Sequence, residues 1–237
     1  MSVLTRARMM GRSVASRRVV TYRKPNFTGY FPSGKNRRQI QYESLLERDY
    51  ILLLEADPHV ISYREQPPPI NWTDGVCHFT TTFDFEVSLS KPGDPLNLKY
   101  LVEIKPAAKV RKYRLDELYG HARAAAISQG YLTLELWTER EIRALPRLTN
   151  AELIGTAITN YFDPSHELAA NTALRQLLTD TDRFTIRQFR RAFNAEQQGY
   201  RTAVRMIARG QLVPIDATAP LDDSAVLTVP SSTRLAA

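Results

Sequence analysis

The pattern of apolar and polar positions in the first 145 residues predicts a mixed α/β domain. Apolar side chains recur at helical spacing from Gln41 to Ala56, and a second apolar stripe runs from Leu115 to a cap at Gly130. Shorter apolar runs, typical of strands, cover Val60–Gln66, Thr80–Val87, Tyr100–Pro106 and Tyr131–Trp137. Residues 67–69 are prolines that end the first of these strands, and a turn is expected at 71–75. The predicted order is therefore α-β-β-β-α-β, followed by a short helix with Thr138 as N-cap.

The pattern changes after Pro146, where short helices replace the strands. Helices are expected at residues 151–162, 167–179, 186–194 and 199–209. Two apolar runs, residues 212–215 and 225–229, could then pair as a hairpin. Helix, turn, helix, hairpin is a winged-helix order, although many small helical domains share this pattern. A small winged-helix-like α+β domain is expected at the C-terminus.

Charge is distributed unevenly along the chain. Residues 1–42 contain ten Lys and Arg and no Asp or Glu, whereas the remaining 195 residues contain 22 basic and 25 acidic side chains. Such a basic arm, with aromatics in its second half, suits a polyanion, although it also imitates a mitochondrial transit peptide. The single cysteine, Cys77, fits a reducing cytosol, and no apolar run is long enough to span a bilayer. We expect a cytoplasmic protein that does not enter membranes.

Two charged residues in the strand that ends at Pro106 are candidates for chemistry. Glu103 and Lys105 alternate with apolar neighbours and point to the same face of the strand. Asp84 lies on the preceding strand, about twenty residues earlier. An aspartate followed by Glu-x-Lys is the constellation of Mg²⁺-dependent phosphodiester hydrolysis, because carboxylates suit a hard cation and a lysine counters phosphate charge. The alternative interpretation is an ion pair on an edge strand.

These motifs resemble those of the TnsA family, the endonuclease subunit of heteromeric (TnsA–TnsB) transposases. The resemblance extends from about Tyr42 to Arg143 and rests on four segments: Glu43–Tyr50, Arg64–Pro67, Phe83–Phe85 and Val102–Ala108. It implies the restriction-endonuclease-like fold, whose αβββαβ core with a mixed sheet is the order predicted above. Phe83 is a departure, because a proline often precedes the aspartate in this family.

The resemblance also implies roles for individual residues. Glu47 takes the place of the catalytic glutamate on the first helix, with Glu43 as the less favoured candidate. Asp84 would bridge metals, Glu103 would be the third ligand, and Lys105 the catalytic lysine. The implied cofactor is one or two Mg²⁺ ions, for which Mn²⁺ can substitute. Gln66 is expected to support the site.

The sequence thus predicts four regions: a basic arm at 1–41, a TnsA-like nuclease domain at 42–148, a winged-helix-like domain at 149–229 and a disordered tail at 230–237. The implied partners are DNA at transposon ends, a TnsB-like transposase and a TnsC-like ATPase. Seven basic residues are expected to bind nucleic acid: Arg37, Arg38, Lys109, Arg111, Lys112, Arg190 and Arg201. Two alternatives are a standalone restriction- or repair-type nuclease and a non-catalytic winged-helix DNA-binding regulator.

Overall fold

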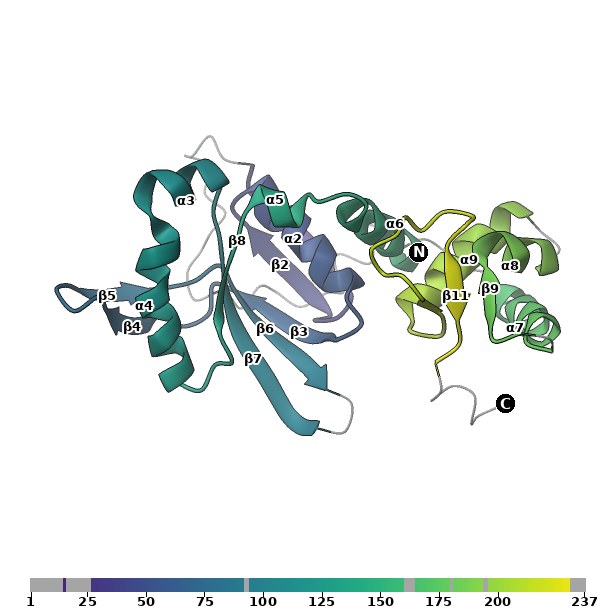
Figure 1. Cartoon of the computed structure of the whole chain (residues 1–237), viewed down its shortest axis with the longest axis horizontal. Helices are drawn as coiled ribbons and strands as arrows, with labels where there is room; N and C mark the ends of the chain where they lie inside the picture. Colours follow the sequence, from purple (N-terminus) through teal and green to yellow (C-terminus); the bar gives the residue numbers. More distant parts are fainter. Residues whose placement is uncertain are drawn as a thin grey trace. The chain divides into compact units, whose positions relative to one another are not determined.

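The computed structural model describes residues 15, 27–91, 94–159, 165–179, 181–193 and 196–230 (Figure 1). The chain divides into two compact units, Met1–Ala144 and Leu145–Ala237. The sequence prediction had placed this boundary between residues 148 and 149. Most of the predicted basic arm and all but the first residue of the predicted tail lie outside the described residues.

Unit 1 is a mixed α/β domain built on a four-stranded sheet. Its strands are β3 (Val60–Glu65), β6 (Phe85–Lys91), β7 (Asp94–Ile104) and β8 (Leu134–Trp137), in the spatial order β3-β6-β7-β8. The first two pairings are antiparallel and the last is parallel, so the sheet is mixed. The helices are α2 (Leu45–Ala56), α3 (Ala107–Tyr113), α4 (Leu115–Ser128) and α5 (Glu139–Ile142). The prediction of a mixed α/β domain is confirmed.

Helices α2 and α4 pack on opposite faces of this sheet. Tyr50 of α2 lies against Phe85 of β6 and Trp137 of β8, with ring centroids 5.6 and 5.2 Å apart. Leu101 of β7 belongs instead to the cluster that contains Tyr119 of α4. Since Phe85 lies opposite Val102 in the sheet, Leu101 points to the other face. The alternation that the sequence predicted for this strand therefore separates two apolar layers.

The predicted strand Thr80–Val87 is wrong in one respect, because it consists of two strands. Strand β5 (His78–Thr81) pairs with β4 (Ile70–Thr73), and β6 begins only at Phe85. The predicted turn at 71–75 falls within the hairpin β4–β5, and residues 71–73 belong to strand β4. The rings of Trp72 and Phe79 stack across the hairpin with their centroids 4.2 Å apart. Asp84 thus lies in the bend before β6 rather than within a strand. The alternating pattern continues through this bend, so periodicity alone does not reveal it.

The predicted helix start at Gln41 is also wrong. Residues Arg38–Tyr42 form β2, which pairs antiparallel with β1 (Gly29–Ser33), and α2 begins at Leu45 with Ser44 as N-cap. Ile40 and Gln41 are both buried; Ile40 lies opposite Phe31 in the pairing with β1, while the backbone N–H of Gln41 donates to Glu65 Oε1 at 3.3 Å. The basic stretch after Pro106, in contrast, is helical and forms α3.

In its described residues, unit 2 combines four helices with a small antiparallel sheet in the order β10-β11-β9. Its elements are α6 (Arg147–Thr159), α7 (Ser165–Leu177), β9 (Arg183–Thr185), α8 (Ile186–Ala192), α9 (Glu196–Ala208), β10 (Val213–Pro214) and β11 (Val226–Thr228). The predicted hairpin is confirmed, whereas β9 was not predicted. Phe184, Phe189 and Phe193 stack in its core.

Helices α8 and α9 approach closely at Gly199. A Cβ atom on this residue would lie 2.9 Å from the Cα of Arg190, so the contact requires glycine.

Among the helices of the described residues, none combines the length and apolarity needed to cross a bilayer.

Candidate active site

Three of the predicted site residues come together where β6 begins and β7 ends. The Lys105 ammonium lies 3.4 Å from Asp84 Oδ2 and forms a closer ion pair with Glu103 Oε1. The backbone N–H of Ile104 donates to Asp84 Oδ2 at 2.8 Å. Because β6 and β7 are hydrogen-bonded neighbours, the bend before β6 brings Asp84 next to the end of β7.

Gln66 fixes the other side of this bend. It follows β3, is buried, and has a backbone φ of 46°. Its N–H donates to the carbonyl oxygen of Asp84 at 2.9 Å. A non-glycine residue in the left-handed region is uncommon and usually has a local reason. Here the hydrogen bond to Asp84 provides one, and it gives Gln66 a supporting role through the backbone.

Glu47 lies in the first turn of α2 and takes part in capping this helix. Its N–H donates to Ser44 Oγ at 3.1 Å, and its carboxylate accepts from the Ser44 hydroxyl at 3.0 Å and from the N–H of Glu43 at 2.7 Å. Burial and then repulsion from Asp84 raise the pKa of Glu47 to about 8. The capping explains why an acid occurs here, while the repulsion shows that Glu47 lies near the strand-end carboxylates.

Glu43 precedes α2, although the predicted helix from Gln41 to Ala56 had included it. Ser44 ends the extended segment, and only residues after it have helical geometry. Glu43 is half-buried, and its charge contributes to raising the pKa of both Asp84 and Glu47. Both glutamates therefore face the same group of carboxylates.

The carboxylates of Asp84, Glu103 and Glu47 carry more negative charge than the ammonium of Lys105 neutralises. Burial and repulsion from Asp84 raise the pKa of Glu103 to about 7, and burial raises the pKa of Asp84 against the opposing effect of Lys105. Burial by itself would lower the pKa of Lys105, but the carboxylates of Asp84 and Glu103 raise it. Lys105 is thus a permanent cation at neutral pH, and the surrounding carboxylates lie close enough to repel one another.

The available oxygens suit a hard cation. Glu103 Oε2 is buried and has no hydrogen-bond partner among the described residues. Within those residues no three His, Cys, Asp or Glu side chains are grouped as a formed metal site, and the Lys105 ammonium contacts both Asp84 and Glu103. Carboxylate oxygens are nevertheless the donors that Mg²⁺ prefers, and a cation would satisfy the orphaned oxygen. The residues present fit such an ion.

One contact at this site was not predicted from the sequence. The hydroxyl of Tyr119, on α4, donates to Glu103 Oε1 at 3.1 Å. Tyr119 lies within the apolar stripe predicted between Leu115 and Gly130, and its ring does pack in the apolar cluster. The position of its hydroxyl depends on how α4 crosses the sheet, and no sequence signal indicates it.

The predicted nucleic-acid contacts separate into exposed and internally paired residues. Exposed side chains are Arg37, Lys109, Arg111, Lys112 and Arg201. Arg38 instead forms an ion pair with buried Glu65 at 2.6 Å, with only 11% of its side chain exposed. Arg190 bonds both carboxylate oxygens of Asp223 at 2.6 Å. Internal carboxylates already pair with Arg38 and Arg190, so the structure favours the five exposed residues, and the binding of nucleic acid at all seven stays a prediction.

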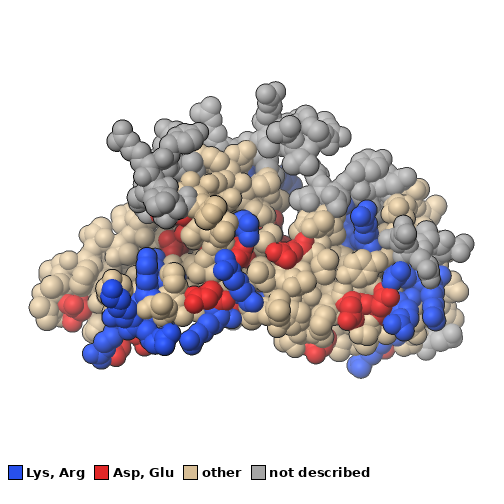
Figure 2. Space-filling model, turned by 90° about the horizontal axis from the view of Figure 1, so that it is seen from above, with Lys and Arg blue, Asp and Glu red and all other residues tan. Residues whose placement is uncertain are grey.

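Three of the exposed residues belong to α3, directly after Lys105. Figure 2 shows Lys and Arg side chains gathered at one end of unit 1, where α3 lies in Figure 1. The Lys112 ammonium also lies 5.1 Å from the centre of the exposed Tyr113 ring. A basic helix with an exposed ring, continuous with the lysine of the site, suits a phosphate backbone next to the carboxylates.

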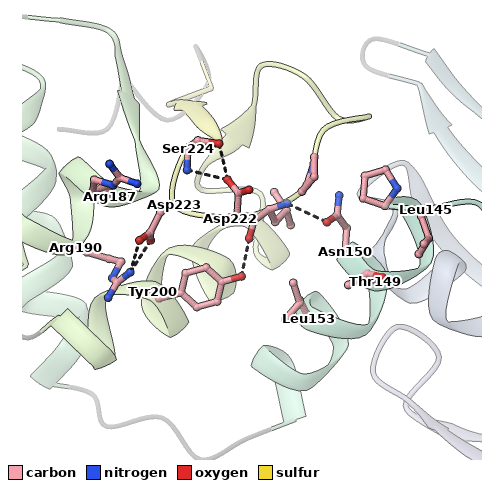
Figure 3. A pocket seen from close by; sticks show the side chains of 13 residues that line it. Leu145, Thr149, Asn150, Leu153, Arg187, Arg190, Tyr200, Asp222, Asp223 and Ser224 are labelled. Carbon is pink, nitrogen blue, oxygen red and sulfur yellow. Dashed lines mark hydrogen bonds and ion pairs between the residues drawn. The ribbon is translucent and has the colours of Figure 1, made fainter.

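A separate groove of about 670 Å³ lies in unit 2 (Figure 3). Two hydrogen bonds within the unit hold the backbone of Leu221, which lines this groove. Asn150 Oδ1 accepts from the N–H of Leu221 at 3.0 Å, and the Tyr200 hydroxyl donates to the Leu221 carbonyl at 2.6 Å. Arg190 and Asp223 pair on its wall. Arg190 and Asp223 satisfy each other, which indicates a structural role for this pair.

Comparisons with known proteins add no assignment to this geometry. No protein-family model matches the chain, and no curated protein is significantly similar to it.

Proposed function

We propose that this chain is a Mg²⁺-dependent DNA endonuclease of the TnsA type, which hydrolyses phosphodiester bonds at the 5′ ends of a transposon. The observation that carries the proposal is the contact of one lysine, Lys105, with two carboxylates, Asp84 and Glu103, beside a third acid, Glu47. The order α2, β3, β6, β7, α4, β8 supports a restriction-endonuclease-like core. Motifs and geometry thus favour the same chemistry.

In this proposal Asp84, Glu103 and Glu47 hold one or two Mg²⁺ ions. When bound, Mg²⁺ lowers the pKa of water and neutralises phosphate charge. The protonated Lys105 positions the attacking water and stabilises negative charge on the phosphoryl oxygens. Because its pKa is raised, Lys105 does not accept the proton of the water. The water would attack phosphorus in line and release its proton to bulk solvent, the bond to the 3′ oxygen would break, and that oxygen would take up a proton from solvent, so that the products are a 5′-phosphate and a 3′-hydroxyl.

The proposed partners follow from the motifs and from the basic surface. DNA would contact α3 and the basic arm, while a TnsB-like transposase and a TnsC-like ATPase would direct the enzyme to transposon ends. The order α7, β9, α8, α9, β10, β11 supports a winged-helix-like C-terminal domain. In such domains the second helix of the helix-turn-helix reads DNA. Here that helix would be α9, whose Thr202, Ala203 and Val204 are buried and whose Arg205 donates to the Ala157 carbonyl on α6. This packing buries one face of α9 and leaves Arg201 exposed, so cleavage rather than packing distinguishes a DNA-binding regulator from the nuclease.

Plasmid cleavage by the full chain tests the proposal. The protein is assayed with Mg²⁺, Mn²⁺ or EDTA, alone and with a TnsB-like transposase bound to its DNA ends. We expect metal-dependent cleavage mainly in the presence of the transposase, and Asp84→Asn should lower the rate at least about a hundredfold. Asp116→Asn, which changes an exposed acid on α4, is the matched control and should leave the rate unchanged.

Two outcomes would contradict this function. Full activity of Asp84→Asn would contradict the assignment of Asp84 to the active site. Site-specific double-strand cleavage by the chain alone would favour the standalone restriction- or repair-type nuclease. End-labelling of the products distinguishes a 5′-phosphate from the 5′-hydroxyl that cleavage of the other P–O bond would leave.

A further inference from the structure

The Glu103 carboxylate is held asymmetrically. Its Oε1 accepts from the Tyr119 hydroxyl at 3.1 Å and pairs with the Lys105 ammonium. Its Oε2 is buried and has no hydrogen-bond partner among the described residues. Two donors therefore act on one oxygen and none on the other, although a buried carboxylate oxygen without a partner is costly.

A second glutamate of the same sheet shows the ordinary arrangement. Glu86, on β6, is also held by one tyrosine and one lysine. There the Tyr131 hydroxyl donates to Oε2 at 3.0 Å and Lys99 donates to Oε1 at 3.1 Å, so each oxygen has a partner. The same three residue types can thus satisfy a carboxylate completely. At Glu103 they leave one oxygen available.

Tyr119 also contacts the segment that carries Asp84. Its ring packs edge-on against Phe83, with centroids 6.0 Å apart and planes at 78°. Phe83 is buried and directly precedes Asp84. The hydroxyl of Tyr119 thus contacts Glu103 while its ring contacts the bend before β6. Because Tyr119 is itself buried, both contacts are fixed by the packing of α4.

We propose that Tyr119 is a positioning residue, which orients the Glu103 carboxylate so that Oε2 is presented to the metal ion. This inference rests on the proposed function. A lysine ammonium has three donors on a flexible stem and tolerates several orientations of its partner, whereas a phenol held by its ring has one hydrogen in a fixed place. Groups that orient a metal ligand in this way typically contribute 10–100-fold to metal affinity or activity.

The test compares Tyr119→Phe with Tyr131→Phe in the full chain. Both variants lose one hydroxyl that donates to a glutamate of the same sheet, but only the first acts on the proposed site. Isothermal titration with Mg²⁺ measures affinity, and cleavage at saturating Mg²⁺ measures the rate. We expect Tyr119→Phe to weaken Mg²⁺ binding about tenfold with an unchanged KM for DNA, and Tyr131→Phe to change neither.

A double-mutant cycle with Glu103→Gln shows whether Tyr119 acts through this carboxylate. In the Glu103→Gln background, Tyr119→Phe should have no additional effect on Mg²⁺ affinity. Equal Mg²⁺ affinities of Tyr119→Phe and Tyr131→Phe would overturn the inference, as would a loss of thermal stability without a change in affinity. If the unmodified chain binds no Mg²⁺, the proposed function itself fails, and that result is distinct from the first two.

Discussion

The strand-end site of unit 1 and the groove of unit 2 both contain charged side chains, but their charges balance differently. In unit 1, Asp84, Glu103 and Glu47 face one cation, Lys105, and the pKa of each carboxyl is raised. In unit 2, both carboxylate oxygens of Asp223 accept from one nitrogen of Arg190, so one cation faces one anion. A balanced pair serves structure, whereas an excess of buried acid opposes folding and is the arrangement expected at the proposed metal site. The contrast separates a pair that holds the fold from the residues of the proposed site.

Removing Lys105 should give the largest effect. Lys105→Ala should lower the cleavage rate at least about a hundredfold, because it removes the positive charge that faces both Asp84 and Glu103. Lys99→Ala is the matched control, since Lys99 pairs with Glu86 on the same sheet at 3.1 Å. Single-turnover cleavage of both variants, with circular dichroism to verify folding, measures the difference. Similar rates for the two would make Lys105 a structural partner of Glu103.

The two glutamates near α2 provide the next test. Glu47→Gln should reduce Mg²⁺-dependent cleavage strongly, whereas Glu43→Gln should reduce it less, because Glu47 is buried and is repelled directly by Asp84. Glutamine retains one oxygen, so it keeps one of the two capping hydrogen bonds that Glu47 accepts with different carboxylate oxygens, from the N–H of Glu43 and from the Ser44 hydroxyl. Rates measured across a Mg²⁺ titration compare the two variants. If only Glu43→Gln were inactive, the ligand would be the residue before the helix.

The excess of acid should also appear as a pH dependence of stability without metal. Glu47 has a pKa near 8 in the folded chain instead of 4.5, and Glu103 one near 7. The folded state therefore holds protons that the unfolded chain has released, so stability falls as the pH rises from about 4.5 to 8. Melting in EDTA should show a lower Tm at pH 8 than at pH 5, with a smaller decrease for Glu47→Gln. Glu152→Gln, an exposed acid of unit 2, should keep the original slope.

Breaking the balanced pair of unit 2 should have the smallest effect. Arg190→Ala and Asp223→Ala should each lower stability by no more than about 1 kcal/mol, because both side chains are partly exposed. The double variant should recover the coupling part of this loss. Cleavage by the full chain should not change. A large decrease in DNA affinity for Arg190→Ala, with unaltered stability, would restore this arginine to the nucleic-acid surface.

The sequence predicted the site better than it predicted the backbone around it. Asp84, Glu103 and Lys105 were identified from residue type and spacing, and the structure brings these three together. The bend before β6 and the strand β2 were missed, because the alternating pattern crosses the bend and β2 is set by pairing with β1. Pairing partners far along the chain override local propensity. The ion pairs of Arg38 and Arg190 were missed for the same reason, since their carboxylate partners Glu65 and Asp223 are distant in sequence.

The sequence by itself determined the two-part organisation, the order of helices and strands around the four-stranded sheet, and the residue types of the candidate site. Hydrophobic periodicity and the spacing of residues are properties of the sequence itself and do not depend on tertiary contacts. Only the tertiary structure decided that Glu43 lies outside α2, that Tyr119 reaches Glu103, and that Glu103 Oε2 stays without a partner. The position of Glu43 depends on where β2, paired with β1, ends and Ser44 caps the helix. The contact of Tyr119 and the burial of Glu103 Oε2 depend on how α4 packs across the sheet, because burial and hydrogen-bond geometry there arise from contacts between segments far apart in sequence.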